Sequence, residues 1–153
     1  MWYNADVTML EERAVEILGA KGPTRRPAQW WRTLRLIIDK GLRVNAFESL
    51  VDYAAITRSD LARAANIPLR TVQRREASRT RKFQRDESDR LVRVARLYAL
   101  AEEVLGSREE AQRWMKTPNR ALDGARPLDE LDTDPAAREV EDLLGRIGDG
   151  VFA

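Results

Sequence analysis

Apolar residues recur every three or four positions along most of the chain, which is the spacing of an amphipathic α-helix. Strand-like alternation with turn dipeptides between the segments is nearly absent. The expected fold class is therefore all-α. The predicted helices span residues 7–18, 29–39, 60–65, 86–105 and 107–114, together with a short helix that Asn45 begins as N-cap and a last helix that begins near Pro135.

The predicted helix over residues 86–105 has an unusually wide apolar surface. Its two stripes consist of Leu91, Val94, Ala95, Tyr98, Ala101 and Leu105 and of Val92, Leu97, Leu100 and Val104. A helix of this kind is buried from two directions. The second direction would be covered either by a second subdomain of the same chain or by the partner in a homodimer. For a dimer, we expect the N-terminal stripe to assist, through Leu10, Ala14 and Ile17.

Other segments predict boundaries. Residues 19–27, GAKGPTRRP, combine Gly, Pro and cations without helical periodicity, so we expect a linker there. Thr57 or Ser59 can cap the helix over residues 60–65. Residues 120–134 contain Gly and Pro, and we expect an ordered loop with short turns.

Residues 58–78, RSDLARAANIPLRTVQRREAS, contain the most specific local pattern, that of a helix-turn-helix unit. Such a unit needs small residues where its two helices touch and a turn residue that accepts left-handed backbone geometry. Ala62 and Ala65 are small, and Asn66 tolerates a positive φ better than most residues. The apolar contacts of the second helix would come from Leu61, Ile67 and Val72. The alternative is a plain helical hairpin with a solvated basic face.

The outward side of that second helix carries donors suited to base edges and phosphates. Arg can bridge guanine, Gln can bridge adenine, and Thr can bond a base edge or a phosphate. Cations that follow the helix suit phosphates beside the groove. The candidate DNA-binding residues are Arg70, Thr71, Gln73, Arg74 and Arg75 on the helix and Arg79, Arg81 and Lys82 after it. Double-stranded operator DNA is the expected partner.

Charge is distributed unevenly along the 153 residues, although the net charge is only +2. Residues 57–98 carry 12 basic and 5 acidic groups, whereas residues 99–153 carry 7 basic and 13 acidic groups. The net charges of these two segments are therefore +7 and −6. This asymmetry indicates two different partners, or else attraction between two halves of the folded chain.

The composition excludes several kinds of chemistry. Cys and His are absent, so disulfides, thiolate nucleophiles, Cys/His zinc sites and His-based catalysis are excluded. Carboxylate pairs such as Glu102/Glu103 are adjacent and point to different sides of a helix. We expect neither enzyme activity nor a metal site. No stretch approaches the roughly 18 apolar residues of a membrane span, and the N-terminus is no secretory signal, so the cytoplasm is the expected location.

Several segments occur in an order that is characteristic of one family. They are GLRVNAFESL (41–50), RTVQRR (70–75), KFQRDESDRLVRVARL (82–97), WMKTPNRALDGARPLDELDTD (114–134) and VEDLLGRIGDGVFA (140–153). The most diagnostic are the W–x(3)–P–N–x(2)–L–x–G–x(2)–P–L constellation and the apolar ending with two glycines. On these residues, over roughly positions 36–153, the chain resembles Xre-type antitoxins with a C-terminal toxin-binding domain, the family usually paired with RES-domain toxins.

The resemblance implies an antitoxin of a type II toxin–antitoxin system, with no cofactor of its own. Such a protein binds and silences an NAD-consuming RES toxin, represses its own operon, and forms a homodimer or a larger assembly. The expected segments are an N-terminal helix and linker (1–30), a helix-turn-helix region for DNA binding and dimerisation (31–98) and a toxin-binding domain (99–153). A stand-alone helix-turn-helix regulator without a toxin partner is the alternative.

Within residues 99–153, some residues would build the domain and others would face the toxin. Trp114 is a core anchor or a contact, Asn119 is expected to bond nearby backbone, and Gly124 is expected to adopt a positive φ. The residues beyond the final glycines would approach the toxin's substrate cleft. The candidate toxin-binding residues are Trp114, Asn119, Leu122, Gly124, Leu144, Ile147, Gly150, Val151, Phe152 and Ala153.

Overall fold

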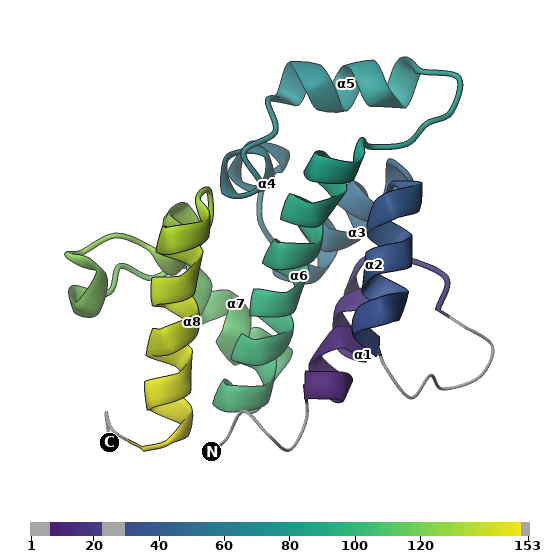
Figure 1. Ribbon diagram of the computed structural model, residues 1–153. Coiled ribbons are helices and arrows are strands. Elements are labelled where there is room, and N and C mark those ends of the chain that lie inside the picture. The colour runs from purple at the N-terminus through teal and green to yellow at the C-terminus, as the bar shows by residue number, and fades with distance from the viewer. Residues whose placement is uncertain (1–6, 23–29, 151–153) are drawn as a thin grey trace.

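The computed structural model describes residues 7–22 and 30–150 of the chain. The fold is all-α, as predicted (Figure 1), and the described residues contain an isolated antiparallel bridge between Arg43 and Lys82 but no β-strand. None of the described helices has the length and apolar content needed to cross a membrane. The elements are α1 (Val7–Ile17), α2 (Trp30–Lys40), α3 (Asn45–Ala54), α4 (Arg58–Ala64), α5 (Leu69–Ala77), α6 (Arg85–Leu105), α7 (Arg108–Lys116), the 3₁₀-helices η2 (Arg120–Leu122) and η3 (Pro127–Glu130), and α8 (Asp134–Gly148).

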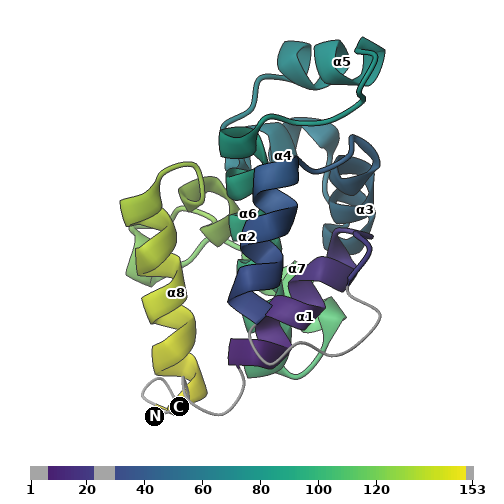
Figure 2. The same ribbon diagram turned by 45° about the vertical axis from the view of Figure 1, so that its right-hand side comes forward.

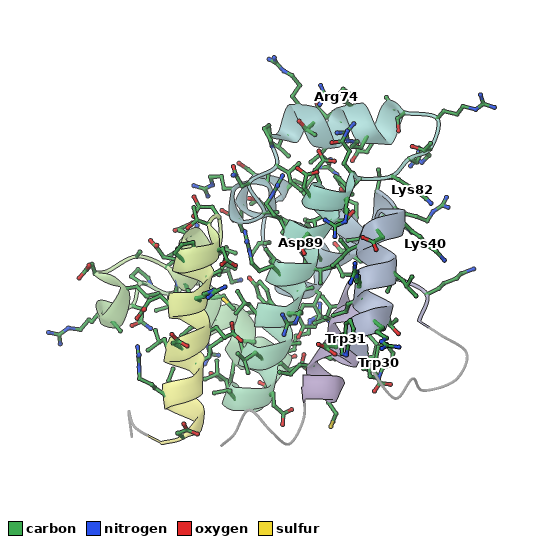
Figure 3. All side chains as sticks on the ribbon, viewed as in Figure 1. Trp30, Trp31, Lys40, Arg74, Lys82 and Asp89 are labelled. Carbon is green, nitrogen blue, oxygen red and sulfur yellow. The ribbon has the colours of Figure 1, made fainter. Side chains whose placement is uncertain are left out.

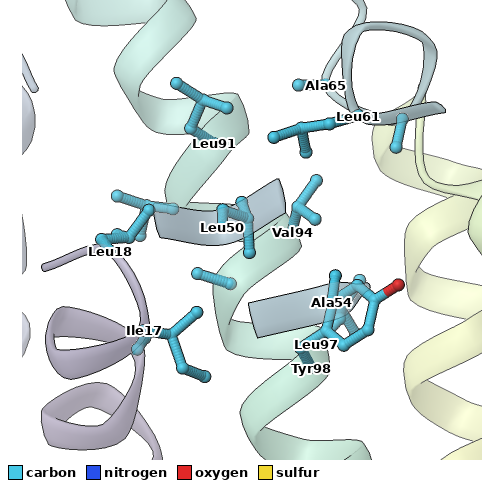
Figure 4. Close-up of a cluster of buried hydrophobic side chains, with 14 of the residues drawn as sticks. Ile17, Leu18, Leu50, Ala54, Leu61, Ala65, Leu91, Val94, Leu97 and Tyr98 are labelled. Atoms are coloured by element: carbon cyan, nitrogen blue, oxygen red, sulfur yellow. The ribbon is translucent and has the colours of Figure 1, made fainter. Parts of the chain in front are cut away.

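Helix α6 lies at the centre of the molecule and is covered from two sides. Helices α1 and α2 pack on one side, and α7 and α8 pack on another (Figures 1 and 2). Leu91, Val94 and Tyr98 of α6 are fully buried, in a cluster that includes Leu18 and Leu50 (Figure 4). The prediction that this helix is buried from two directions is confirmed, and the same chain supplies both covering layers.

This burial changes the expectation for a dimer surface. Val92, Leu97 and Leu100, from the second stripe of α6, are at most 5% exposed. Ala14 and Ile17 of α1, which were expected to assist, are buried as well. The apolar surface of α6 that suggested a dimer is therefore used inside one chain, and a dimer needs a different surface.

Helix α1 is tied into the core by a polar cluster around Glu102 of α6. Arg13 of α1 donates to both carboxylate oxygens of Glu102, at 3.2 and 3.3 Å, and the Tyr53 hydroxyl of α3 donates to the same carboxylate. The Arg13 guanidinium also lies over the Tyr53 ring, 5.6 Å from its centroid. Helix α1 thus shares one core with α3 and α6, while residues 23–27 of the predicted linker lie outside the described residues.

Helix α7 closes the C-terminal end of α3. Arg108 and Gln112 donate to the Tyr53 carbonyl oxygen at 3.0 and 2.7 Å, and the Lys116 ammonium donates to the Ala55 carbonyl oxygen at 3.1 Å. The last carbonyl groups of a helix lack partners within that helix, so α7 supplies the missing donors. These bonds join the N-terminal and C-terminal regions into one body.

Two predicted helix starts have different outcomes. Thr57 caps α4 by accepting a hydrogen bond from the Asp60 amide at 3.0 Å, so one of the two predicted caps is confirmed. Asn45, in contrast, is the first helical residue of α3, and Val44 occupies the cap position without a side-chain bond. The backbone holds this turn instead, because the Val44 amide donates to the Arg81 carbonyl oxygen at 3.0 Å.

Tyr98 allows a test of the core around α6. Its ring is fully buried with its centroid 6.1 Å from that of Tyr53, and its hydroxyl has no partner within the described residues. Because a buried unpaired hydroxyl costs free energy, Tyr98→Phe should leave the free energy of unfolding unchanged or raise it by up to about 1 kcal/mol. Tyr98→Ala, which empties the site, should lower it by about 3–5 kcal/mol. Urea unfolding measures both, and similar losses in the two variants would contradict this account.

Candidate functional site

Helix α5 presents a polar face at one end of the molecule (Figure 1). Val72 is buried on its inner side, whereas Arg70, Gln73 and Arg74 are exposed and share a helical face at spacings of three and four residues. Thr71 is half-buried beside them. Figure 3 shows Arg74 on the outer side of α5. The exposed face therefore holds donors of the kinds that bond base edges and phosphates.

Arg75 points from α5 toward α6 instead of toward solvent. Its Nε and Nη2 atoms donate to the two carboxylate oxygens of Glu87 at 2.9 and 3.0 Å, and the two side chains are 16% and 8% exposed. Burial raises the pKa of Glu87, but hydrogen bonds from Arg75 and from the Gln84 amide hold that pKa below its ordinary value. The structure thus corrects the expectation that Arg75 contacts a base, because its guanidinium fixes α5 to α6.

A second ion-pair cluster fixes the C-terminal half of α5. Arg58 of α4 donates to Glu76 of α5 at 2.7 Å and pairs with Glu48 of α3. Its guanidinium also lies 5.4 Å from the centroid of the Phe47 ring. Each of these half-exposed pairs contributes modestly to stability. Together they join three helices at one cation and so fix the direction of α5.

The turn between α4 and α5 has the geometry of the predicted helix-turn-helix unit. Asn66 has a φ of 50°, so the expected positive φ is confirmed. Ala65 and Ile67 are buried, and the Ala65 carbonyl oxygen accepts a hydrogen bond from Arg90 of α6 at 2.9 Å. Helix α6 therefore supports the turn as well as the helix that follows it.

The segment after α5 turns back toward α6. Ser78 Oγ donates to a carbonyl oxygen in the last turn of α5 at 2.8 Å and accepts from the Arg81 amide at 3.2 Å. The Arg81 guanidinium is exposed and also donates to a carbonyl oxygen of that turn. Arg79 is exposed and has no ion pair within the described residues, whereas Lys82 is half-buried. The three predicted phosphate contacts thus differ in exposure, and Arg81 alone among them donates to a backbone carbonyl oxygen within the described residues.

The loop after α7 is organised by Asn119. Its Oδ1 atom accepts from the Ala121 amide at 2.9 Å, its carbonyl oxygen accepts from the Gly124 amide at 2.9 Å, and its amide donates to the Ala125 carbonyl oxygen at 3.0 Å. Gly124 has a φ of 86°. The expected bonds of Asn119 to nearby backbone, the positive φ of Gly124 and the ordered loop are all confirmed.

The other candidate residues of the C-terminal region divide by burial. Trp114 and Leu122 are half-buried and pack against the core, Ile147 is half-buried, and Gly150 is exposed with a φ of 77°. Leu144 is fully buried, so it supports the domain from within and is not available as a toxin contact. Val151, Phe152 and Ala153 lie outside the described residues.

Arg126 joins this region to the helix-turn-helix unit. It donates to Asp129 at 2.7 and 2.8 Å and to Asp60 of α4 at 3.3 Å. Burial raises the pKa of Asp60, but hydrogen bonds from Arg63, Thr57 and Arg126 hold that pKa below its ordinary value. The first helix of the helix-turn-helix unit is therefore anchored to the loop that precedes α8.

Helix α5 and the C-terminal end of α8 lie at opposite ends of the molecule in both views (Figures 1 and 2). The end of α8 lies close to α6, since a Cβ atom at Gly148 would be 3.4 Å from Val104 Cγ2. The described residues include no group of carboxylates suited to hold a metal ion. The structure thus offers two separate surfaces, one at α5 and one at the end of α8.

Comparison with known proteins agrees with this division. The family model of the antitoxin Xre-like helix-turn-helix domain matches residues 33–96, and that of the antitoxin Xre/MbcA/ParS C-terminal toxin-binding domain matches residues 100–150. An antitoxin Xre from Photorhabdus laumondii is 34% identical over 121 residues, which are 78% of this chain and 81% of that protein. The chain belongs to the Xre antitoxin family.

Other relatives show the same similarity. An antitoxin Xre from Yersinia enterocolitica is 35% identical over 117 residues, 76% of this chain and 78% of that protein. One from Pseudomonas putida is 39% identical over 84 residues, 55% of this chain and 52% of that protein. The resemblance inferred from the sequence is confirmed: this Xre-family chain is an antitoxin with a helix-turn-helix domain and a C-terminal toxin-binding domain. The two matched ranges meet near residues 96–100, a point that lies inside α6.

Three residues that position the Xre-family helix-turn-helix unit were not predicted from the sequence. They are Arg58, Glu87 and Arg126. A signal for Glu87 exists, because Gln84 and Glu87 form a capping box at the start of α6. No comparable local pattern identifies Arg58 or Arg126, since the partners that join them to other helices are distant in sequence.

The pair of Arg75 and Glu87 predicts a pH-dependent stability. Glu87→Gln leaves a buried guanidinium without its counter-charge and should lower the free energy of unfolding by about 3 kcal/mol at pH 7. Because the pKa of Glu87 is lower in the folded than in the unfolded chain, its stabilisation is present above the unfolded pKa of about 4.3 and is lost as the pH falls through the folded pKa. The difference between wild type and variant should therefore shrink between about pH 5 and pH 3.

Urea unfolding at pH 7 and at pH 4 measures this difference. Asp89→Asn is the matched control, because Asp89 is an exposed carboxylate of the same helix beyond its first turn. The control should change stability by less than about 0.5 kcal/mol. A Glu87→Gln deficit that is the same at both pH values would refute the assigned pair.

Proposed function

We propose that this antitoxin neutralises a RES-type, NAD-consuming toxin and represses the operon that encodes it. The observation that supports two partners is the placement of two surfaces at opposite ends of one core: the exposed face of α5 and the C-terminal end of α8. The RES assignment rests on the resemblance to the family. A duplex at one end leaves the other end open to a protein. The same molecule can therefore hold operator and toxin together.

In the proposed complex with DNA, α5 enters the major groove. Arg70, Gln73 and Arg74 face base edges, and the half-buried Thr71 bonds a base edge or the nearest phosphate. Arg79, Arg81 and Lys82 neutralise phosphates beside the groove. Arg75 is a positioning residue in this arrangement, because its bond to Glu87 orients the helix.

In the proposed complex with the toxin, the contact surface is the end of α8 and the chain that follows it. A cleft that binds NAD must stabilise a pyrophosphate, usually with Arg side chains or helix N-termini. Residues 99–153 carry a net charge of −6, and Asp142 and Asp149 are exposed on and after α8. This negative charge suits such a cleft. The proposed contact residues are Ile147, Gly150, Val151, Phe152 and Ala153, with Trp114 and the loop around Asn119 as support.

A homodimer or larger assembly completes the proposal, because a helix-turn-helix protein that reads a paired operator binds two half-sites about one helical turn apart. Burial of α6 means that the contact between copies lies elsewhere. Among the described residues, large exposed apolar side chains occur on α1 and α2, at Met9, Trp31 and Leu36.

Recognition of the operator should depend on Arg74. Arg74→Ala removes an exposed donor that forms no ion pair or side-chain hydrogen bond within the described residues, so we expect operator affinity to fall by about 1–3 kcal/mol while stability is unchanged. Arg79→Gln should weaken binding to all duplexes about equally and reduce the dependence of affinity on salt. Fluorescence anisotropy with operator and scrambled duplexes at several salt concentrations measures both effects.

Arg120→Ala serves as the control for the loss of one positive charge, because Arg120 is exposed on η2, outside the helix-turn-helix unit. It should leave operator affinity unchanged. Wild-type affinity of Arg74→Ala for the operator would exclude the assigned face.

Toxin neutralisation should depend on the chain end. Removal of residues 150–153 takes nothing from the described core, because α8 ends at Gly148. Folding and operator binding should therefore persist, whereas the toxin should become active. Co-expression of the truncated chain with its toxin, followed by growth and cellular NAD, tests this. Normal growth with intact NAD would place the inhibitory contact on residues 107–147 instead.

A further inference from the structure

A cavity of about 420 Å³ lies between the end of α1, the end of α2 and the start of α3. Its floor is apolar and includes Leu18, Ile37 and Ala46. Four cationic side chains line it, and no carboxylate is among its lining residues. The cations are Lys21, Lys40, Arg43 and Lys82.

Two of these cations are held close together by the backbone. Arg43 and Lys82 form the isolated antiparallel bridge, which is flanked by hydrogen bonds from the Phe83 amide to the Leu42 carbonyl oxygen at 2.8 Å and from the Leu42 amide to Ser88 Oγ at 2.9 Å. Residues directly opposite in such a bridge place their side chains on the same face, and like charges in that position repel each other. The repulsion costs stability unless an anion lies between the two side chains.

On the side of the cavity formed by this bridge, the backbone at Gly41 lies close to the backbone at Phe83. Gly41 has a φ of 81°, and a Cβ atom there would lie 2.4 Å from the Phe83 carbonyl oxygen. Gly41 thus allows the two segments to approach each other and brings Lys40, at the end of α2, beside Lys82 (Figure 3). Lys40 and Arg43 come from the end of α2 and the segment that joins it to α3, Lys82 comes from the segment before α6, and all three line one cavity.

These cations are not neutralised by the protein. None of the four forms an ion pair or a side-chain hydrogen bond within the described residues, whereas Asp39, which precedes Lys40, is bound by Arg85 at 2.7 Å. In Figure 3 Lys40 and Lys82 lie on the flank of the molecule, away from the outer side of α5 where Arg74 lies. The cavity therefore lies apart from the face proposed to read bases, although it shares Lys82 with the proposed phosphate contacts.

We propose that this cavity binds a small phosphate ester of the nucleotide class. The phosphates lie among Lys40, Arg43 and Lys82, where they relieve the repulsion between the cations, and the base or another apolar group lies on the floor. Ligand cavities typically combine an apolar lining with a few convergent polar groups, and this volume suits one mononucleotide. Charge-assisted bonds to several cations favour a di- or triphosphate over a neutral nucleoside.

Titration of the full chain with ADP, followed by calorimetry and by amide NMR signals, tests this proposal. ADP should bind at least about tenfold more tightly than inorganic phosphate or adenosine alone, because it uses both the cations and the floor. Perturbed amide signals should cluster at Gly41, Arg43 and Ala46. Equal affinity for ADP and phosphate would overturn the nucleotide assignment.

The double variant Lys40→Gln/Arg43→Gln should bind ADP at least about tenfold more weakly. Since it removes like charges that repel each other, its melting temperature without ligand should equal or exceed that of the wild type, which separates loss of binding from loss of fold. Arg120→Gln, the same change at an exposed cation outside the cavity, should bind ADP normally. Failure of ADP to bind, combined with weaker binding of the double variant to any duplex, would show a surface for DNA phosphates and refute the proposal.

Discussion

The burial of α6 from two sides is the constraint on which the rest of the structure depends. Leu91 and Val94 contact the layer that includes α1 and α3, while the other side of the helix supports α7 and α8. A single 21-residue helix is therefore the shared core of the helix-turn-helix domain and the toxin-binding domain. The two family matches meet inside it, so a chain cut there would expose apolar surface in both parts. The helix-turn-helix domain and the toxin-binding domain thus match separate family models but share one packed core.

Polar contacts decide the direction of α5, because its apolar contacts are few. Val72 is buried and Leu69 packs half-buried against the core, both in the first half of this nine-residue helix, so its second half has no buried apolar side chain to fix its direction. The pair of Arg75 and Glu87 and the cluster around Arg58 supply that direction. Two-pronged bonds between guanidinium and carboxylate groups are directional, whereas apolar packing is not. A recognition helix held in this way can expose most of its surface to a partner without losing its orientation.

The sequence predicts the elements well and the polar contacts poorly, for physical reasons. Apolar spacing depends on residues three or four apart, so the all-α class, the length of α6 and the turn at Asn66 could be recognised from local patterns. The side on which a cation points depends on partners elsewhere in the chain. Arg74 and Arg75 are adjacent and chemically identical, yet only tertiary packing shows that the first is exposed and the second is paired with Glu87. The same limit explains why the dimer surface predicted on α6 is wrong. The periodicity of α6 does not show whether the helices that cover it belong to the same chain or to a second copy.

Some of the unequal charge of the two halves is used in ion pairs between them. Arg93 approaches Asp134 at 4.0 Å, and Asp60 of the basic half pairs with Arg126 of the acidic half. The exposed cations of α5 take no part in this, because α5 and the end of α8 lie at opposite ends of the molecule. Charges so far apart in solvent are screened beyond about 10 Å at ordinary salt concentration and stabilise the fold little. Attraction within the chain therefore does not explain the exposed cations of α5, and an external anionic partner does, which favours the two-partner interpretation for this end of the molecule.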